Sequence, residues 1–308
     1  VLQGSNTYGK VSIFNDDNVK DWTGAPSMPP GIFARDRNIR NVGQGAALTK
    51  AGDYIYGVAG EHTISLFAYN TASDSPSWAT LPEIPLTDEL PSQGEPNYDS
   101  TTDEGFWRGS DVWYPGTGNY IYAAGMYDTK SRRGTYITHR GFWRFGPINS
   151  STGAPQGGAS WEKLGDLPAY LEERKFIIYD PDLSGQKLHL LSGKNYTRPW
   201  VYNTTGGRTG AGQWETLVLS PYDSSNGINV TYSPDDNSLY YVPAETKTSF
   251  FRYSITYNDW VELEPAPAGI RWMGNRLTYL GGYIYCLQGN TQDGFWRFKV
   301  GQAADVDA

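Results

Sequence analysis

The sequence is poor in several residue types, and each shortage excludes a class of structure or site. Its 308 residues include one cysteine, Cys286, so no intramolecular disulfide can form, and its apolar neighbours predict a buried side chain. The three histidines, His62, His139 and His189, are too scattered for the ligand spacing of a zinc site. No apolar run approaches the roughly 18 residues that a membrane-spanning helix requires.

Charge is scarce as well, since only 19% of the residues are charged and the acidic ones are in excess. The net charge of −8 and the lack of a basic stripe argue against nucleic acid as a partner. No run of lysine and arginine is long enough to bind a membrane surface. The sequence also contains no glycine-rich phosphate loop and no Gly-x-Ser-x-Gly elbow. We therefore expect neither a cofactor nor a metal.

Aromatic residues, in contrast, make up 15% of the chain, and five tryptophans recur in a similar context. Each one precedes a short tail rich in leucine and proline. They are Trp22, Trp78, Trp161, Trp214 and Trp260, at spacings of 56, 83, 53 and 46 residues. Recurrence at such a period indicates a repeat architecture, in which copies of one unit stack to bury a shared core.

Each repeat contains four short apolar runs. The second run mostly ends in a glycine, which allows the positive φ that a tight hairpin turn needs. The third run carries aromatic residues and occurs six times, at 11–14, 66–69, 142–145, 200–202, 250–253 and 295–298. Alternation within the runs fits β-strands. Units of four antiparallel strands repeated around a ring are the blades of a β-propeller, so the sequence predicts an all-β fold of this type.

The order of these signals resembles the Kelch family of β-propellers. A glycine follows the second strand, an aromatic residue lies in the third, and a tryptophan in the fourth precedes a Leu-Pro tail. The resemblance covers nearly the whole chain, which departs from the usual double glycine. It implies a blade of the galactose-oxidase type without that enzyme's copper site, which needs two histidines, two tyrosines and a cross-linked cysteine.

We expect one propeller domain over residues 1–308. The runs predict full blades at 38–85, 86–168, 169–221 and 222–267, partial blades at 1–37 and 268–300, and a tail at 301–308. Six third-strand runs favour six blades, with incomplete blades at the termini. Five blades closed by an N-terminal outer strand are the alternative.

Function is expected on the face where second strands turn into third strands and where one blade leads to the next. Its two longest insertions, 86–106 and 126–141, are predicted to be loops of one blade. Arginines near the predicted first strands would surround the channel mouth, a location that the Kelch resemblance supports. Guanidinium groups bind carboxylates, and aromatic rings stack on sugars. The predicted ligand-binding residues are Arg40, Arg108, Arg174, Arg271, Trp107, Trp272 and His62. Alternatively, the arginines bond to carbonyl groups of neighbouring blades.

Four Asn-x-Ser/Thr sequons indicate a glycoprotein. They begin at Asn149, Asn195, Asn203 and Asn229. The chain begins at Val1 without an initiator methionine, which is consistent with removal of a leader. Both observations favour a secreted, extracellular protein.

Three functions remain open. The first is non-catalytic binding of an acidic or neutral glycan, or of an extracellular protein. The second is a polysaccharide lyase that cleaves uronic-acid glycans by β-elimination, in which Arg133 would neutralise the carboxylate and Tyr136 or His139 would move the proton. The third is self-assembly through the unpaired edges of incomplete terminal blades.

Overall fold

The computed structural model describes residues 9–15, 21–33, 37–43, 45–85, 105–106, 110–130, 136–164, 167–168, 176–178, 187–191, 199–203, 213–218, 228–243, 248–270, 276–289 and 292–301. Every regular element among these residues is a β-strand. No helix in this part of the chain is long and apolar enough to cross a membrane. The chain divides into two compact units, Val1–Leu171 and Glu172–Ala308.

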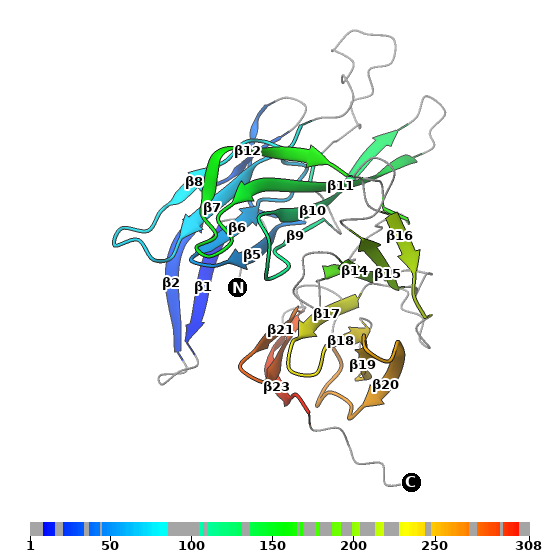
Figure 1. Ribbon diagram of the computed structural model, residues 1–308. Helices are drawn as coiled ribbons and strands as arrows, with labels where there is room; N and C mark the ends of the chain where they lie inside the picture. Colours follow the sequence, from blue (N-terminus) through cyan, green and yellow to red (C-terminus); the bar gives the residue numbers. More distant parts are fainter. Residues whose placement is uncertain are drawn as a thin grey trace, which may run out of the picture. The chain divides into compact units, whose positions relative to one another are not determined.

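The first unit contains two four-stranded antiparallel sheets and two hairpins (Figure 1). The sheets consist of β5 (Ala47–Ala51), β6 (Tyr54–Val58), β7 (Leu66–Asn70) and β8 (Trp78–Thr80), and of β9 (Asp111–Trp113), β10 (Ile121–Lys130), β11 (Tyr136–Ile148) and β12 (Pro155–Lys163). The hairpins are β1 (Gly9–Asn15) with β2 (Asp21–Met28), and β3 (Gly31–Ile32) with β4 (Ile39–Arg40).

The second unit contains two further four-stranded sheets and one sheet of three strands. The four-stranded sheets are β13 (Phe176–Ile178), β14 (Lys187–Leu191), β15 (Pro199–Asn203) and β16 (Gln213–Thr216), then β17 (Ile228–Ser233), β18 (Ser238–Pro243), β19 (Phe250–Ser254) and β20 (Asp259–Leu263). The three-stranded sheet is β21 (Arg276–Leu280), β22 (Tyr283–Gly289) and β23 (Gln292–Lys299). In each sheet the strands pair in chain order, as in propeller blades, so the predicted all-β propeller fold is confirmed. The number of blades stays a prediction.

Neighbouring sheets within a unit meet at their first strands. The backbone N–H of Tyr114, just after β9, donates to Thr49 Oγ1 on β5 (2.8 Å). In the second unit, the N–H of Tyr279 on β21 donates to Thr231 Oγ1 on β17 (3.1 Å). A threonine hydroxyl on one first strand therefore fixes the next first strand in both units.

Four tryptophans of the repeat lie on the fourth strand of a sheet, and Trp22 lies on β2 of the first hairpin; each is directly opposite an aromatic residue of the strand before it. The cross-strand pairs are Phe14–Trp22, Tyr69–Trp78, Phe145–Trp161, Tyr202–Trp214 and Tyr253–Trp260. In the last four, the ring centroids lie 5.2, 5.4, 4.9 and 5.0 Å apart. Such aromatic pairs contribute about 0.5–1.5 kcal/mol beyond the area that they bury.

One long segment differs from the prediction. The sequence predicts a loop over residues 126–141, but 126–130 and 136–141 extend β10 and β11 into a ribbon that continues beyond β9 and β12 (Figure 1). The register pairs Met126 with Arg140 and continues to Lys130 opposite Tyr136. Threonine, tyrosine and isoleucine recur in this segment, and these residue types favour strands.

Candidate functional site

Three chain segments meet at Thr63, in the connection between β6 and β7. Thr63 forms antiparallel bridges with Phe33 on one side and Phe106 on the other. The N–H of Phe106 donates to the carbonyl of Thr63 (2.8 Å), and the N–H of Ile64 donates to that of Ile32 (3.0 Å). Thr63 is fully buried. Backbone bonds therefore hold together segments that lie far apart in the sequence.

Two glycines allow this close approach. A Cβ on Gly31 would lie 2.6 Å from the Cβ of Thr63, and one on Gly105 would lie 2.4 Å from the carbonyl oxygen of His62. Gly105 also has a φ of 130°, which L-residues rarely adopt. Only glycine fits at these two positions without moving the backbone.

The turn that leads into Thr63 is conformationally strained. The N–H of Thr63 donates to the carbonyl of Gly60 (2.9 Å), and the two residues between them, Glu61 and His62, have φ values of 51° and 59°. Turns of this kind usually contain asparagine and glycine. A left-handed residue other than glycine costs on the order of 1 kcal/mol, and such residues concentrate at functional sites.

Phe33 brings two predicted site residues together. The guanidinium carbon of Arg40 lies 4.5 Å from the centroid of the Phe33 ring. The His62 ring meets the same ring edge-on, at 6.2 Å between centroids and 86° between planes. Phe33 is buried, His62 is partly exposed and Arg40 is exposed. We refer to Phe33, Arg40 and His62 as the Phe33 cluster.

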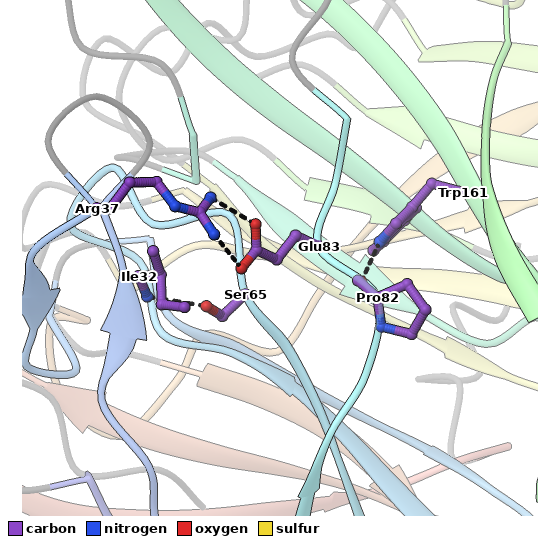
Figure 2. A network of polar contacts seen from close by, with 6 residues as sticks. All are labelled: Ile32, Arg37, Ser65, Pro82, Glu83 and Trp161. Atoms are coloured by element: carbon purple, nitrogen blue, oxygen red, sulfur yellow. Dashed lines mark hydrogen bonds and ion pairs between the residues drawn. The ribbon is translucent and has the colours of Figure 1, made fainter.

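An ion pair anchors the hairpin that carries Arg40. Arg37, which has a φ of 58°, donates through both terminal nitrogens to the two carboxylate oxygens of Glu83, at 2.6 and 2.8 Å (Figure 2). This hydrogen bonding raises the pKa of the Arg37 guanidinium above its ordinary value. The charge of Arg37 is therefore balanced within the fold by Glu83.

Two more bonds in Figure 2 fix the surrounding backbone. The N–H of Ile32 donates to Ser65 Oγ (2.8 Å), and the indole N–H of Trp161 donates to the carbonyl of Pro82 (2.9 Å). The connector after β8 is thus held on one side by the next blade and on the other by Arg37. A binding surface on such elements would be rigid before a ligand arrives.

Arg40 and His62 are the predicted ligand-binding residues that the structure describes. The sequence suggested that Arg40 lies beside the start of the first strand of its blade, which is β5. In the structure it lies on the short strand β4 instead. The remaining predicted residues, Arg108, Arg174, Arg271, Trp107, Trp272 and Arg133, lie outside the described residues. Tyr136 and His139 lie on β11, where the pairing places His139 opposite Tyr127 and describes nothing of the side chains. The lyase residues stay a prediction.

The four sequons differ in their surroundings. Asn149 is partly exposed, and its Oδ1 accepts the N–H groups of Ser151 and Thr152, both at 2.9 Å, which does not involve Nδ2. Asn203 is also partly exposed, and Asn195 lies outside the described residues. Asn229 is 1% exposed, and its Oδ1 accepts the N–H of Leu277 (3.1 Å). The glycan predicted at Asn229 is therefore wrong, because an inner strand leaves no room for it.

Sequence reasoning missed Phe33, Arg37 and Glu83. Phe33 lies outside the repeated aromatic runs, and Arg37 is 46 residues from Glu83. The single local signal was a second arginine three residues before Arg40.

No protein-family model matches the chain, and no curated protein matches it by sequence. Solved structures with a similar fold include two that each have a TM-score of 0.52. The structure of YjhT is 14% identical and aligns over 79% of this chain and 72% of its own. A fungal alcohol oxidase of the AA5 family, in complex with copper, is 9% identical and aligns over 94% of this chain and 66% of its own. At these identities the likenesses show the fold alone.

The surroundings of the one cysteine do not fit a copper centre. Cys286 is buried on β22 in an apolar cluster with Ile270, Leu277 and Ile284. Burial raises the pKa of its thiol to about 12, so it stays protonated and is a poor metal ligand at neutral pH. Across the described ranges, no three histidine, cysteine or acidic side chains gather in a possible metal site.

Proposed function

We propose that this protein is a secreted, non-catalytic β-propeller that binds an acidic glycan at the Phe33 cluster. The observation that carries this proposal is that Arg40 lies over one face of the buried Phe33 ring while His62, in a strained turn, meets the same ring edge-on. Guanidinium groups bind carboxylates through planar N–H donors and also stack on aromatic faces, and imidazole can add a hydrogen bond or a positive charge. Uronic acids combine such a carboxylate with hydroxyl groups and an apolar ring face. The sequons at the partly exposed Asn149 and Asn203 support the proposed extracellular location.

Replacement of Arg40 tests the binding proposal. Arg40→Ala should weaken binding of an oligouronate by about 10- to 100-fold, because a hydrogen bond to a charged group contributes about 1.5–3 kcal/mol. The affinity of Arg40→Lys should lie between that of the native protein and that of Arg40→Ala, because lysine keeps the positive charge but lacks the planar guanidinium group. Isothermal titration calorimetry measures both.

The matched control is Arg144→Ala. Arg144 also stacks on an aromatic ring, 4.2 Å from the centroid of Tyr120, but it pairs with Glu162 (2.7 Å), and both lie on the β9–β12 sheet and not in the Phe33 cluster. Its loss should leave oligouronate affinity unchanged. Equal weakening by both arginine variants, or no oligouronate binding by the native protein, would reject the Phe33 cluster as the site. Release of an unsaturated product during the titration would indicate the lyase instead.

His62→Asn should separate binding from stability. Asparagine adopts the left-handed conformation more readily than histidine, and this gain offsets the loss of the ring contact with Phe33. We expect the free energy of unfolding to stay within about 1 kcal/mol of the native value, while oligouronate affinity falls. Urea unfolding measures the stability, and calorimetry on the same preparation measures the oligouronate affinity. A large loss of stability with unchanged affinity would mean that His62 is structural.

A further inference from the structure

The turn between β11 and β12 holds the sequon Asn149-Ser150-Ser151 in a fixed conformation. The backbone N–H of Asn149 donates to the carbonyl of Ala154 (2.8 Å), and the N–H of Gly153 donates to the carbonyl of Asn149 (2.7 Å). Ser150 and Ser151 are exposed, and Asn149 is partly exposed. The asparagine and the serine of this sequon therefore both lie at the surface of a well-formed turn.

The side-chain amide of Asn149 has a defined orientation within this turn. Its Oδ1 accepts the backbone N–H groups of Ser151 and Thr152, both at 2.9 Å. Only the oxygen of a carboxamide accepts such donors, so the hydrogen bonds identify which atom is oxygen and which is nitrogen. Because Nδ2 lies on the opposite branch of the planar group, it points away from the backbone that Oδ1 faces.

The same turn lies at the end of the first unit that is opposite to the Phe33 cluster. The N–H of Asp53 donates to the carbonyl of Thr152 (2.8 Å), and the hydroxyl of Tyr56 donates to that of Gly153 (2.6 Å). Asp53 immediately precedes β6, whereas the strained turn with His62 follows this strand. At about 3.3 Å per residue of strand, the two turns are roughly 20 Å apart.

We propose that Asn149 carries an N-linked glycan, which stands at the end of the first unit away from the Phe33 cluster. A glycan is bulky and needs an exposed point of attachment, which Asn149 offers and the buried Asn229 does not. This inference rests on the secreted location in the proposed function, but it does not depend on oligouronate binding.

The modification transfers an oligosaccharide from a lipid diphosphate to the side chain of Asn149. A bond forms between Nδ2 and the anomeric carbon of the first sugar, and the bond from that carbon to the diphosphate oxygen breaks. Nδ2 gives up one proton, and the lipid diphosphate leaves. Since Oδ1 is not involved, its two hydrogen bonds within the turn can persist after the transfer.

Mass spectrometry of the full chain, purified from its native source, tests the proposal. Treatment with an amidase that releases N-linked glycans should lower the mass of the chain and leave aspartate at position 149, while Asn229 should remain asparagine. An unmodified Asn149 would overturn the proposal, whatever the chain binds. A glycan at Asn229 would overturn the burial argument by which the site is chosen.

Three variants, produced in the secretory pathway of a eukaryotic cell, separate the glycan from the turn. Asn149→Asp keeps an oxygen for the two N–H donors but has no amide nitrogen, and Ser151→Ala removes the hydroxyl that the sequon requires, so both should lose the glycan. Thr152→Ala changes the same turn outside the sequon and should keep it. Equal glycan occupancy in all three variants would reject Asn149 as the attachment point.

Calorimetry on two of these proteins tests where the glycan stands. The native chain and Asn149→Asp should bind an oligouronate with the same affinity, because the Phe33 cluster lies at the other end of the unit. A change in affinity on loss of the glycan would overturn this placement. If neither protein binds the oligouronate, the proposed function fails, and the mass measurement still decides whether Asn149 is glycosylated.

Discussion

Trp161→Ala is expected to lower the free energy of unfolding by about 3–5 kcal/mol, the range for removal of a buried tryptophan side chain. Trp161 is 8% exposed, and its ring centroid lies 5.4 Å from that of Phe145 and 6.5 Å from that of Phe106. Its N–H also donates to the carbonyl of Pro82, so the variant breaks packing within a blade and the link to its neighbour. The thermal midpoint should fall by roughly 6–20 °C in a scan followed by circular dichroism.

Two companion variants define the cause. Trp161→Phe keeps an apolar ring but loses the indole N–H. We therefore expect it to lower the free energy of unfolding less than Trp161→Ala does, with about 1 kcal/mol of the decrease due to the lost hydrogen bond. Tyr257→Ala removes a ring that is 81% exposed and should change stability by no more than about 0.5 kcal/mol. If Trp161→Ala and Tyr257→Ala had similar small effects, the tryptophans would not join the blades.

Raising the pH is expected to unfold the protein before pH 12. Burial raises the pKa of Tyr253 and of Cys286 to about 12, and it also raises the pKa of Tyr56 and Tyr240. In the unfolded chain these groups ionise near their ordinary values of 9 for the thiol and 10 for the phenols. Their contribution to stability is therefore complete below about pH 9 and disappears as the pH rises toward the folded pKa values.

Tryptophan fluorescence and tyrosinate absorbance, recorded together against pH, measure this transition. Loss of structure and ionisation of the buried tyrosines should coincide in one cooperative step. Tyr253→Phe removes one titrating group and should move the midpoint to higher pH, although it loses the hydrogen bond to Asn258 Oδ1. Tyrosine ionisation that is complete while the native fluorescence persists would contradict the prediction.

The sequence was sufficient to predict the strands of the blades, because their signals are local. The aromatic residue of the third strand and the tryptophan of the fourth are cross-strand neighbours. Their order along the chain is therefore enough to predict that these two strands pair. The loop prediction was wrong for residues 126–130 and 136–141, because their charged residues hid a strand-forming pattern.

The candidate site could be predicted only in part, because it is built from distant segments. Arg40 and His62 were expected on the same face, but the ring that joins them, Phe33, has no distinctive sequence context. The Arg37–Glu83 pair depends on how the connector after β8 folds back. At Asn229 a local signal was misleading. The sequence of a sequon does not show whether its asparagine is exposed on a loop or buried on a strand, and Asn229 is buried.

Three tryptophans of the repeat donate their indole N–H to the preceding repeat: Trp78 to the carbonyl of Pro26, Trp161 to that of Pro82 and Trp260 to that of Val218. Each acceptor is the fourth residue after a tryptophan of the repeat, so one repeat can carry both a donor, its tryptophan, and an acceptor, the carbonyl four residues later. We call these bonds the indole links, and they bear on how such a chain can be rearranged. Donor and acceptor are close in sequence, so duplication or deletion of a whole repeat keeps every link matched. A cut between a tryptophan and its tail would break two links at once. Viable circular permutations of this chain should therefore open between blades after the tail, and not within it.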